Sequence, residues 1–282
     1  MVRIKLIIFF MLFVQVLSAQ TLHLRKRKAN ALEGKAFALT INDSTLSLKD
    51  REDIILKEIR RGNVPDFLRN LYKLNIKADS TGAETVFISI FVLPDYLSIG
   101  SNNDFFYVPM TPILAQRIAN LTNCILPTKS LVDDIHVGSE IKLKPQPINP
   151  SKAMTTVPVF IAHTDSVLNQ LEPFLIKHTA GALTAGNKKD IIISNKIYGE
   201  PTPRVVIYGW HKLDGKAIQP VYNKHTNTWA DYSHGVRLIQ NKIYINNKKT
   251  TLKRALTNPK LSRFFSEEGV IKKPYYPVYR KY

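Results

Sequence analysis

The segment from residue 187 to residue 240 holds most of the residue types that carry out chemistry. It contains three of the seven histidines, together with aspartates, a serine and a pair of lysines. Three apolar runs, at residues 191–194, 205–208 and 236–239, surround these polar groups and are typical of strands. A polar group at the end of a buried strand is held rigidly and can be aimed at a substrate. The sequence therefore places the candidate functional site in this segment.

Two histidines with polar neighbours indicate acid–base catalysis. His211 ends the run RVVIYGWH, and His234 lies in the run DYSHG. Imidazole exchanges protons near neutral pH, and a carboxylate can orient it. We therefore predict His211 or His234 as the general base or acid, oriented by Asp231. Ser233 or a water molecule is the predicted nucleophile. The alternative is that these groups only order a long loop through hydrogen bonds.

Basic and aromatic side chains near the histidines are the predicted substrate-binding groups. The cations would hold negative charge on a substrate or a transition state, and an indole ring can form the wall of a pocket. For the lysine pair at 188–189 the alternative is an exposed turn before a strand. The full predicted set is Lys188, Lys189, Tyr208, Trp210, His225 and Arg237.

The same segment offers an imidazole–carboxylate set that would suit a zinc ion with one position open for water. The candidate ligands are His211, His225, Asp231 and His234. The chain has no HExxH sequence, and the only closely spaced pair in this set is Asp231 with His234. We therefore predict no metal and no other cofactor, with zinc at these four residues as the alternative.

The stretch from residue 206 to residue 238 resembles the catalytic segment of the L,D-transpeptidase family. That family pairs an isoleucine-histidine-glycine strand with a serine-histidine-glycine-cysteine-x-arginine strand. The residues that match the second strand are Ser233, His234, Gly235 and Arg237. The family's nucleophilic cysteine falls at Val236 and its upstream histidine at Tyr208. The resemblance therefore implies a role in the envelope or in polymer processing, without the thiol chemistry of the family.

The beginning of the chain has the layout of a secretory signal peptide. Arg3 and Lys5 precede an apolar run at residues 6–17, and Leu17-Ser18-Ala19 offers a cleavage site with small residues. The apolar run is too short for a comfortable membrane span. We predict that residues 1–19 are removed and that the mature chain is secreted or periplasmic. The alternative is an uncleaved N-terminal anchor.

A single cysteine excludes an internal disulfide. Cys124 comes at the end of a predicted amphipathic helix, where a thiol is ordinarily a small buried apolar group. The alternative is a catalytic thiol paired with a histidine.

The chain is strongly basic. Its formal net charge of +18 falls by two when Arg3 and Lys5 leave with the signal peptide. Such an excess favours an anionic polymer or glycan as substrate, and peripheral association with the cell envelope. The charge is dispersed and no nucleic-acid-binding motif accompanies it, so we predict no nucleic-acid partner. The oligomeric state stays open.

Helices and strands follow one another in a mixed order, which favours an α+β fold. We predict a mixed, largely antiparallel sheet with flanking helices in a single globular domain at residues 47–282, preceded by an extended arm at residues 20–46. The proline-rich residues 144–151 mark the one candidate internal boundary. Predicted helices begin at about residues 47, 112, 128, 165 and 252, with Ser47 and Thr111 as caps and the helix from residue 128 ending near residue 135. Predicted strands lie at residues 85–93, 105–108, 156–162 and 242–245.

These observations together predict an exported hydrolase that acts on an extracellular or cell-wall polymer by histidine-centred acid–base chemistry. The polymer is expected to be anionic, such as a polysaccharide or peptidoglycan, because the protein is basic. The alternative is a non-catalytic secreted protein that binds a polyanionic glycan.

Overall fold

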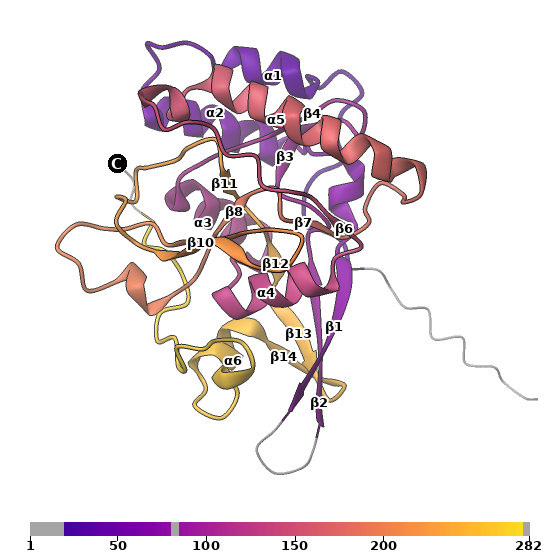
Figure 1. The fold of residues 1–282 in the computed structure, drawn as a ribbon, viewed down its shortest axis with the longest axis vertical. Helices are drawn as coiled ribbons and strands as arrows, with labels where there is room; N and C mark the ends of the chain where they lie inside the picture. Colours follow the sequence, from indigo (N-terminus) through magenta and orange to yellow (C-terminus); the bar gives the residue numbers. More distant parts are fainter. Residues whose placement is uncertain (1–19, 80–84, 279–282) are drawn as a thin grey trace, which may run out of the picture.

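The computed structural model describes residues 20–79 and 85–278. The predicted signal peptide, residues 1–19, lies outside the described residues. Helices and strands in the described ranges are distributed along the whole chain (Figure 1). The α-helices are α1 (Gly34–Thr40), α2 (Leu48–Arg60), α3 (Pro112–Leu121), α4 (Lys129–Gly138), α5 (Val157–Leu171) and α6 (Leu252–Thr257). Short 3-10 helices lie at Asp66–Arg69, Lys152–Thr155, Glu172–Ile176, Asn195–Ile197 and Ser262–Phe264.

The strands are mostly short, and most of their pairings are antiparallel. They are β1 (Tyr72–Asp79), β2 (Thr85–Val92), β3 (Ser98–Gly100), β4 (Phe105–Tyr107), β5 (Cys124–Ile125), β6 (Ile141–Lys142), β7 (Thr184–Ala185), β8 (Lys189–Ile191), β9 (Ile207–His211), β10 (Ala217–Tyr222), β11 (His234–Gly235), β12 (Ile239–Gln240), β13 (Lys242–Ile245) and β14 (Lys248–Thr251). The predicted α+β class is confirmed.

The larger sheet is built on the long antiparallel hairpin of β1 and β2, which pairs from Tyr72 opposite Val92 to Asp79 opposite Thr85. Strands β12 and β13 also pair antiparallel with β2, β5 joins β12, and β14 joins β13. The β13–β14 connection turns at Asn246 and Asn247. Both asparagines have positive φ angles, a conformation that asparagine tolerates better than most residues.

The smaller sheet positions the candidate site, with the strand order β10-β9-β8-β11. Strand β9 pairs antiparallel with β10 and β8, whereas β11 runs parallel to β8. The apolar runs that the sequence assigned to strands are fully buried at residues 191–193 and 205–207. The strand prediction itself is only partly right, because residues 192–194 and 205–206 lie outside β8 and β9. Helix α4 packs against β9 and so brings its own side chains to the edge of this sheet.

Two helices begin where the sequence predicts a cap. The Ser47 side chain accepts a hydrogen bond from the backbone of Asp50 at the start of α2. The Thr111 side chain does the same for Leu114 at the start of α3, where Pro112 occupies the first turn. Such caps satisfy backbone donors that the helix itself leaves unpaired.

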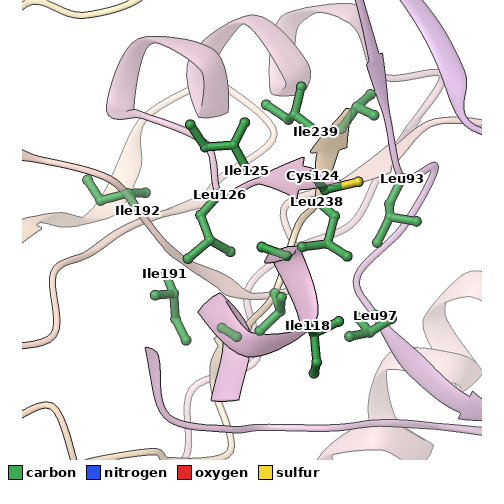
Figure 2. Close-up of a cluster of buried hydrophobic side chains, with 14 of the residues drawn as sticks. Leu93, Leu97, Ile118, Cys124, Ile125, Leu126, Ile191, Ile192, Leu238 and Ile239 are labelled. Carbon is green, nitrogen blue, oxygen red and sulfur yellow. The ribbon is translucent and has the colours of Figure 1, made fainter. Parts of the chain in front are cut away.

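Cys124 belongs to strand β5, just after α3 ends, and not to the helix itself. Its side chain is surrounded by the apolar core, close to Leu93 and Leu238 (Figure 2). Burial raises the pKa of this thiol to about 12. The thiolate, which is the reactive form, is therefore strongly disfavoured. The prediction of a core thiol is confirmed.

Two predicted local structures are wrong. Residues 156–162, expected as a strand, form the first half of α5. Buried positions recur along that helix at Val157, Phe160, Val167 and Leu171, so one apolar face overrides the β-branched composition of its first turn. The arm at residues 20–46 is not extended throughout. It contains α1, whose residue Phe37 is fully buried in the core.

One apolar core extends from Leu22 to Tyr276 and includes residues on both sides of the proline-rich stretch. Residues 144–151 therefore do not separate two cores, and the predicted single domain is confirmed. In the described ranges, no helix combines the length and the hydropathy needed to cross a bilayer.

Candidate functional site

A backbone kink in β9 places two polar side chains on the same side of the strand. Gly209 and Trp210 have consecutive positive φ angles of 104° and 57°. Side chains alternate along a regular strand, so Tyr208 and His211, three residues apart, would face opposite sides without the kink. A positive φ is uncommon for a bulky residue such as tryptophan, and strained backbone of this kind clusters at functional sites.

The two side chains meet on the carboxylate of Asp133, which lies on α4. The Oδ1 atom of Asp133 accepts hydrogen bonds from the Tyr208 hydroxyl at 2.7 Å and from His211 Nε2 at 2.9 Å. The Lys129 ammonium donates to the other oxygen, Oδ2, at 2.9 Å. Burial raises the pKa of Asp133, but the hydrogen bonds from His211, Tyr208 and Lys129 outweigh burial and lower it overall. Asp133 is therefore ionised at neutral pH. We call these four residues the Asp133 site.

The ionised carboxylate decides which nitrogen of His211 carries the proton. A carboxylate accepts hydrogen bonds and cannot donate one, so the neutral imidazole keeps its proton on Nε2. The second nitrogen, Nδ1, makes no hydrogen bond to a described residue and can accept a proton. The His211 side chain is 5% exposed and the Asp133 side chain is 33% exposed. This pair therefore has the form of a general base with its orienting carboxylate, in which the carboxylate reaches the surface and the imidazole is largely buried.

The ring of His136 packs against the ring of His211. The two rings stack with centroids 4.5 Å apart and an angle of 20° between their planes. Burial, together with the nearby His211 and Lys142, lowers the pKa of His136 to about 4. The stacked ring is therefore neutral at neutral pH and fixes the plane of His211 without adding a charge. Next to Asp133, burial and the Asp133 charge raise the pKa of Asp134 to about 6.

The predicted partner Asp231 does not orient His211. Its carboxylate accepts hydrogen bonds from the Ser233 amide at 2.9 Å, from the Ser233 hydroxyl at 2.5 Å and from Trp229 Nε1 at 3.2 Å. These bonds order the loop before β11, which is the alternative that the sequence left open. Burial raises the pKa of Asp231, but His234 and the Ser233 hydrogen bond lower it overall, to about 2. The Ser233 hydroxyl donates its hydrogen bond to this carboxylate and not to a histidine. The predicted role of Ser233 as nucleophile therefore lacks an adjacent histidine base.

His234 lies in β11 and is only 1% exposed. Its Nε2 atom is 3.9 Å from the Asp231 carboxylate, which is beyond hydrogen-bond distance. Neither ring nitrogen has a hydrogen-bond partner among the described residues. Burial lowers the pKa of His234 to about 4, so the ring is neutral at neutral pH. We call Asp231, Ser233 and His234 the Asp231 turn.

Two predicted substrate-binding cations are buried and engaged in the fold. Lys188 is fully buried and donates to the Tyr232 carbonyl at 2.8 Å, with His163 Nδ1 at 2.9 Å. Burial lowers the pKa of Lys188 to about 7. Arg237 is also fully buried and donates to the carbonyl oxygens of Leu93 and Thr184. Both side chains therefore make hydrogen bonds inside the protein and are not exposed to bind a substrate. Residue 188 is not part of an exposed turn.

Of the remaining predicted binding residues, Lys189 and His225 lie nearer the surface, whereas Trp210 and Tyr208 are buried. Lys189 is half-buried, and its ammonium lies 4.9 Å from the centre of the Trp210 ring. His225 is half-buried and stacks on Trp229 at 4.7 Å. Tyr208 belongs to the Asp133 site. Lys189, Trp210 and His225 therefore remain predicted substrate contacts.

The alternative zinc set is not assembled. His211 is bound to Asp133, His225 stacks on an indole ring, and His234 makes no hydrogen bond to Asp231. In the described part of the chain no group of three or more His, Cys, Asp or Glu side chains is arranged to hold a metal ion.

Sequence reasoning missed Asp133 because it lies 78 residues before His211. The predicted helix at residues 128–135 did carry a signal. Lys129 and Asp133 are four apart and face the same side of a helix, and His136 follows three residues later. Which strand this polar face meets depends on the tertiary fold.

The two segments that resemble the transpeptidase pattern lie in the same sheet. Strands β9 and β11 flank β8, so Tyr208 and Gly235 both lie opposite Asp190. Val236, at the position of the family's cysteine, is buried. Comparisons of the chain with models of protein families, with curated proteins and with solved structures give no match.

Proposed function

We propose that this protein is an exported hydrolase that acts on an anionic polymer of the cell envelope, with His211 as general base and Asp133 as the residue that orients it. The observation that carries the proposal is the hydrogen bond between His211 Nε2 and Asp133 Oδ1 at 2.9 Å. The strained backbone at Trp210 supports it, and the 33% exposure of Asp133 leaves the carboxylate side of the pair open to solvent.

In the proposed reaction, Nδ1 of His211 takes a proton from a water molecule while the water oxygen attacks the bond to be broken. The imidazole becomes positively charged, and the Asp133 carboxylate stabilises that charge through the Nε2 hydrogen bond. The proton on Nδ1 then passes to the leaving group, which restores the neutral imidazole. Tyr208 and Lys129 keep Asp133 ionised throughout.

The compartment and the class of substrate rest on the sequence. The signal-peptide layout of residues 1–19 supports export, and the net charge of +18 supports an anionic substrate. The local resemblance to L,D-transpeptidases supports a polymer of the envelope. Lys189, close to Trp210, is the proposed contact for a negative group of the substrate.

The test compares turnover by the wild-type protein and by Asp133→Asn, on dye-labelled peptidoglycan and on polygalacturonate. An asparagine can donate to Nε2 and so favours the tautomer with its proton on Nδ1, which cannot accept a proton from water. We expect turnover to fall by roughly 10²- to 10⁴-fold with little change in melting temperature.

The matched control is Asp134→Asn, which makes the same chemical change one residue further along α4. Asp134 makes no hydrogen bond to His211, so this variant should keep turnover within a few-fold. If Asp133→Asn keeps wild-type turnover, or if the wild-type protein cleaves neither polymer, the proposed function is wrong.

A further inference from the structure

A basic cavity lies far along the chain from the Asp133 site, between the N-terminal segment and helices α2 and α3. Its volume is about 900 Å³. Residues 21–25 form one wall, the second half of α2 forms another, and α3 contributes two side chains. The charged residues that line it are Arg25, Asp53, Lys57, Arg60, Arg61 and Arg117.

Three of these cations have no counter-charge inside the protein. Arg25, Lys57 and Arg60 are exposed and make no ion pair with a described residue. The single lining carboxylate, Asp53, is already bound to Arg117 at 3.0 Å and to Lys49 at 2.5 Å. The cavity therefore keeps a concentrated positive charge that the fold does not neutralise, and such charge attracts anions.

The spacing of the cations favours a ligand with repeated negative groups. Lys57 and Arg60 are three residues apart on α2, so they share a face of the helix. Arg61 caps the end of α2, four residues after Lys57, and pairs with Glu58 at 2.9 Å. Arg25 faces Lys57 and Arg60 from a different segment. A volume of about 900 Å³ is much larger than one small anion needs. A concave surface also fits a chain better than the flat surface of a bilayer.

We infer that this cavity binds a linear polyanion, a polymer whose repeating units carry carboxylate or phosphate groups. The inference deepens the proposed function, and rests on it, because it gives the anionic substrate a docking surface separate from His211. The apolar side chains of Leu24 and Leu121 also line the cavity and offer a surface for the backbone of the polymer.

The test measures the affinity of the full chain for fluorescein-labelled polygalacturonate and for inorganic polyphosphate, as a function of salt. One variant carries Arg25→Gln, Lys57→Gln and Arg60→Gln. The matched control carries Lys248→Gln, Lys249→Gln and Lys260→Gln, which removes the same charge from exposed positions. Lys248 and Lys249 lie on β14, at the opposite end of the molecule from α2 (Figure 1).

We expect the cavity variant to bind at least one of the two polymers roughly tenfold more weakly at 100 mM salt, with the slope of log affinity against log salt reduced by about two. The control should stay within about threefold of the wild type. Preference for polygalacturonate would identify carboxylate as the recognised group, and preference for polyphosphate would identify phosphate.

Three results would overturn the inference. These are no binding of either polymer, an equal loss of affinity in the cavity variant and the control, and, in a parallel assay, binding only to vesicles that contain phosphatidylglycerol. Binding assays on Asp133→Asn separate this question from catalysis. A polymer that binds but is never cleaved contradicts the proposed function alone. If the cavity variant cleaves the polymer and binds it as the wild type does, the inference that the cavity binds the polymer is wrong, and the proposed function is unaffected.

Discussion

The Asp133 site and the Asp231 turn each contain a largely buried histidine and a carboxylate, but they differ in geometry and in the burial of the carboxylate. In the Asp133 site the two groups are 2.9 Å apart, and the side chains of Asp133 and His211 are 33% and 5% exposed. In the Asp231 turn they are 3.9 Å apart, and the side chains of Asp231 and His234 are 4% and 0% exposed. The pair that the sequence places three residues apart is thus the one without a hydrogen bond.

The difference follows from what each carboxylate already binds. The Asp231 carboxylate accepts hydrogen bonds from Ser233 and Trp229, within its own loop. Asp133 lies on a helix that is packed against β9; two of its partners, Tyr208 and His211, come from that strand, and Lys129 comes from its own helix. A loop aspartate close to a histidine in sequence therefore tends to order the backbone, and a carboxylate from a second element is free to orient the ring.

The largest expected effect separates the two histidines. His211→Asn keeps a donor for Asp133 but removes the proton acceptor, so we expect turnover per folded molecule to fall by roughly 10²- to 10⁴-fold. His211 and His234 are both buried, so each variant should lower the melting temperature, but His234→Asn should keep turnover per folded molecule within a few-fold. Turnover assays and thermal melts on both variants check this. The comparison fails if His234→Asn loses as much turnover per folded molecule as His211→Asn.

Acid should destabilise the protein through His234. The pKa of this ring is about 4 in the folded state, below its ordinary value of 6.5, because burial disfavours the charged form. Its contribution to stability is complete above pH 6.5 and is lost as the pH falls towards 4, by about 3 kcal/mol. Denaturant titrations at pH 7 and pH 4 measure the loss. His234→Gln should show a smaller difference between the two pH values.

Asp231→Asn should cost about 2 kcal/mol of unfolding free energy at pH 7. The pKa of Asp231 is about 2 in the folded state, below the ordinary 3.8, so its stabilisation is present above pH 4 and is lost as the pH falls towards 2. Denaturant unfolding of the variant at pH 7 and at pH 3 checks both statements. We expect turnover per folded molecule to be unchanged, and a selective loss of turnover would make Asp231 catalytic.

The smallest effect concerns Tyr208→Phe. Removing this donor weakens the stabilisation of the Asp133 carboxylate by about 1 kcal/mol, so the pKa of Asp133 moves up towards its ordinary value. Turnover should fall only a few-fold at pH 7, and the pKa of Asp133, followed by NMR of its carboxyl carbon, should be higher in the variant. An unchanged pKa of Asp133 would show that the Tyr208 hydrogen bond does not stabilise the carboxylate.

Local sequence signals predicted several elements well because helix caps and apolar patterns depend on residues that are close together in the chain. The caps at Ser47 and Thr111 and the apolar run of β2, which is buried in its second half, follow from nearby residues alone. The strand predicted at residues 156–162 failed because the apolar face of α5 continues far beyond that window. The candidate site was half predicted: His211 and Tyr208 were identified, whereas Lys188 and Arg237 proved to be interior cations.

By itself the sequence determined the α+β class and the basic character of the chain, and it led to the prediction that chemistry takes place around His211, because composition, apolar periodicity and residue type do not depend on long-range contacts. Only the tertiary structure decided which carboxylate meets which histidine. The packing of α4 on β9 and the kink at Gly209 and Trp210 bring Asp133 to His211. Those contacts join residues far apart in the chain, and no spacing in the sequence encodes them.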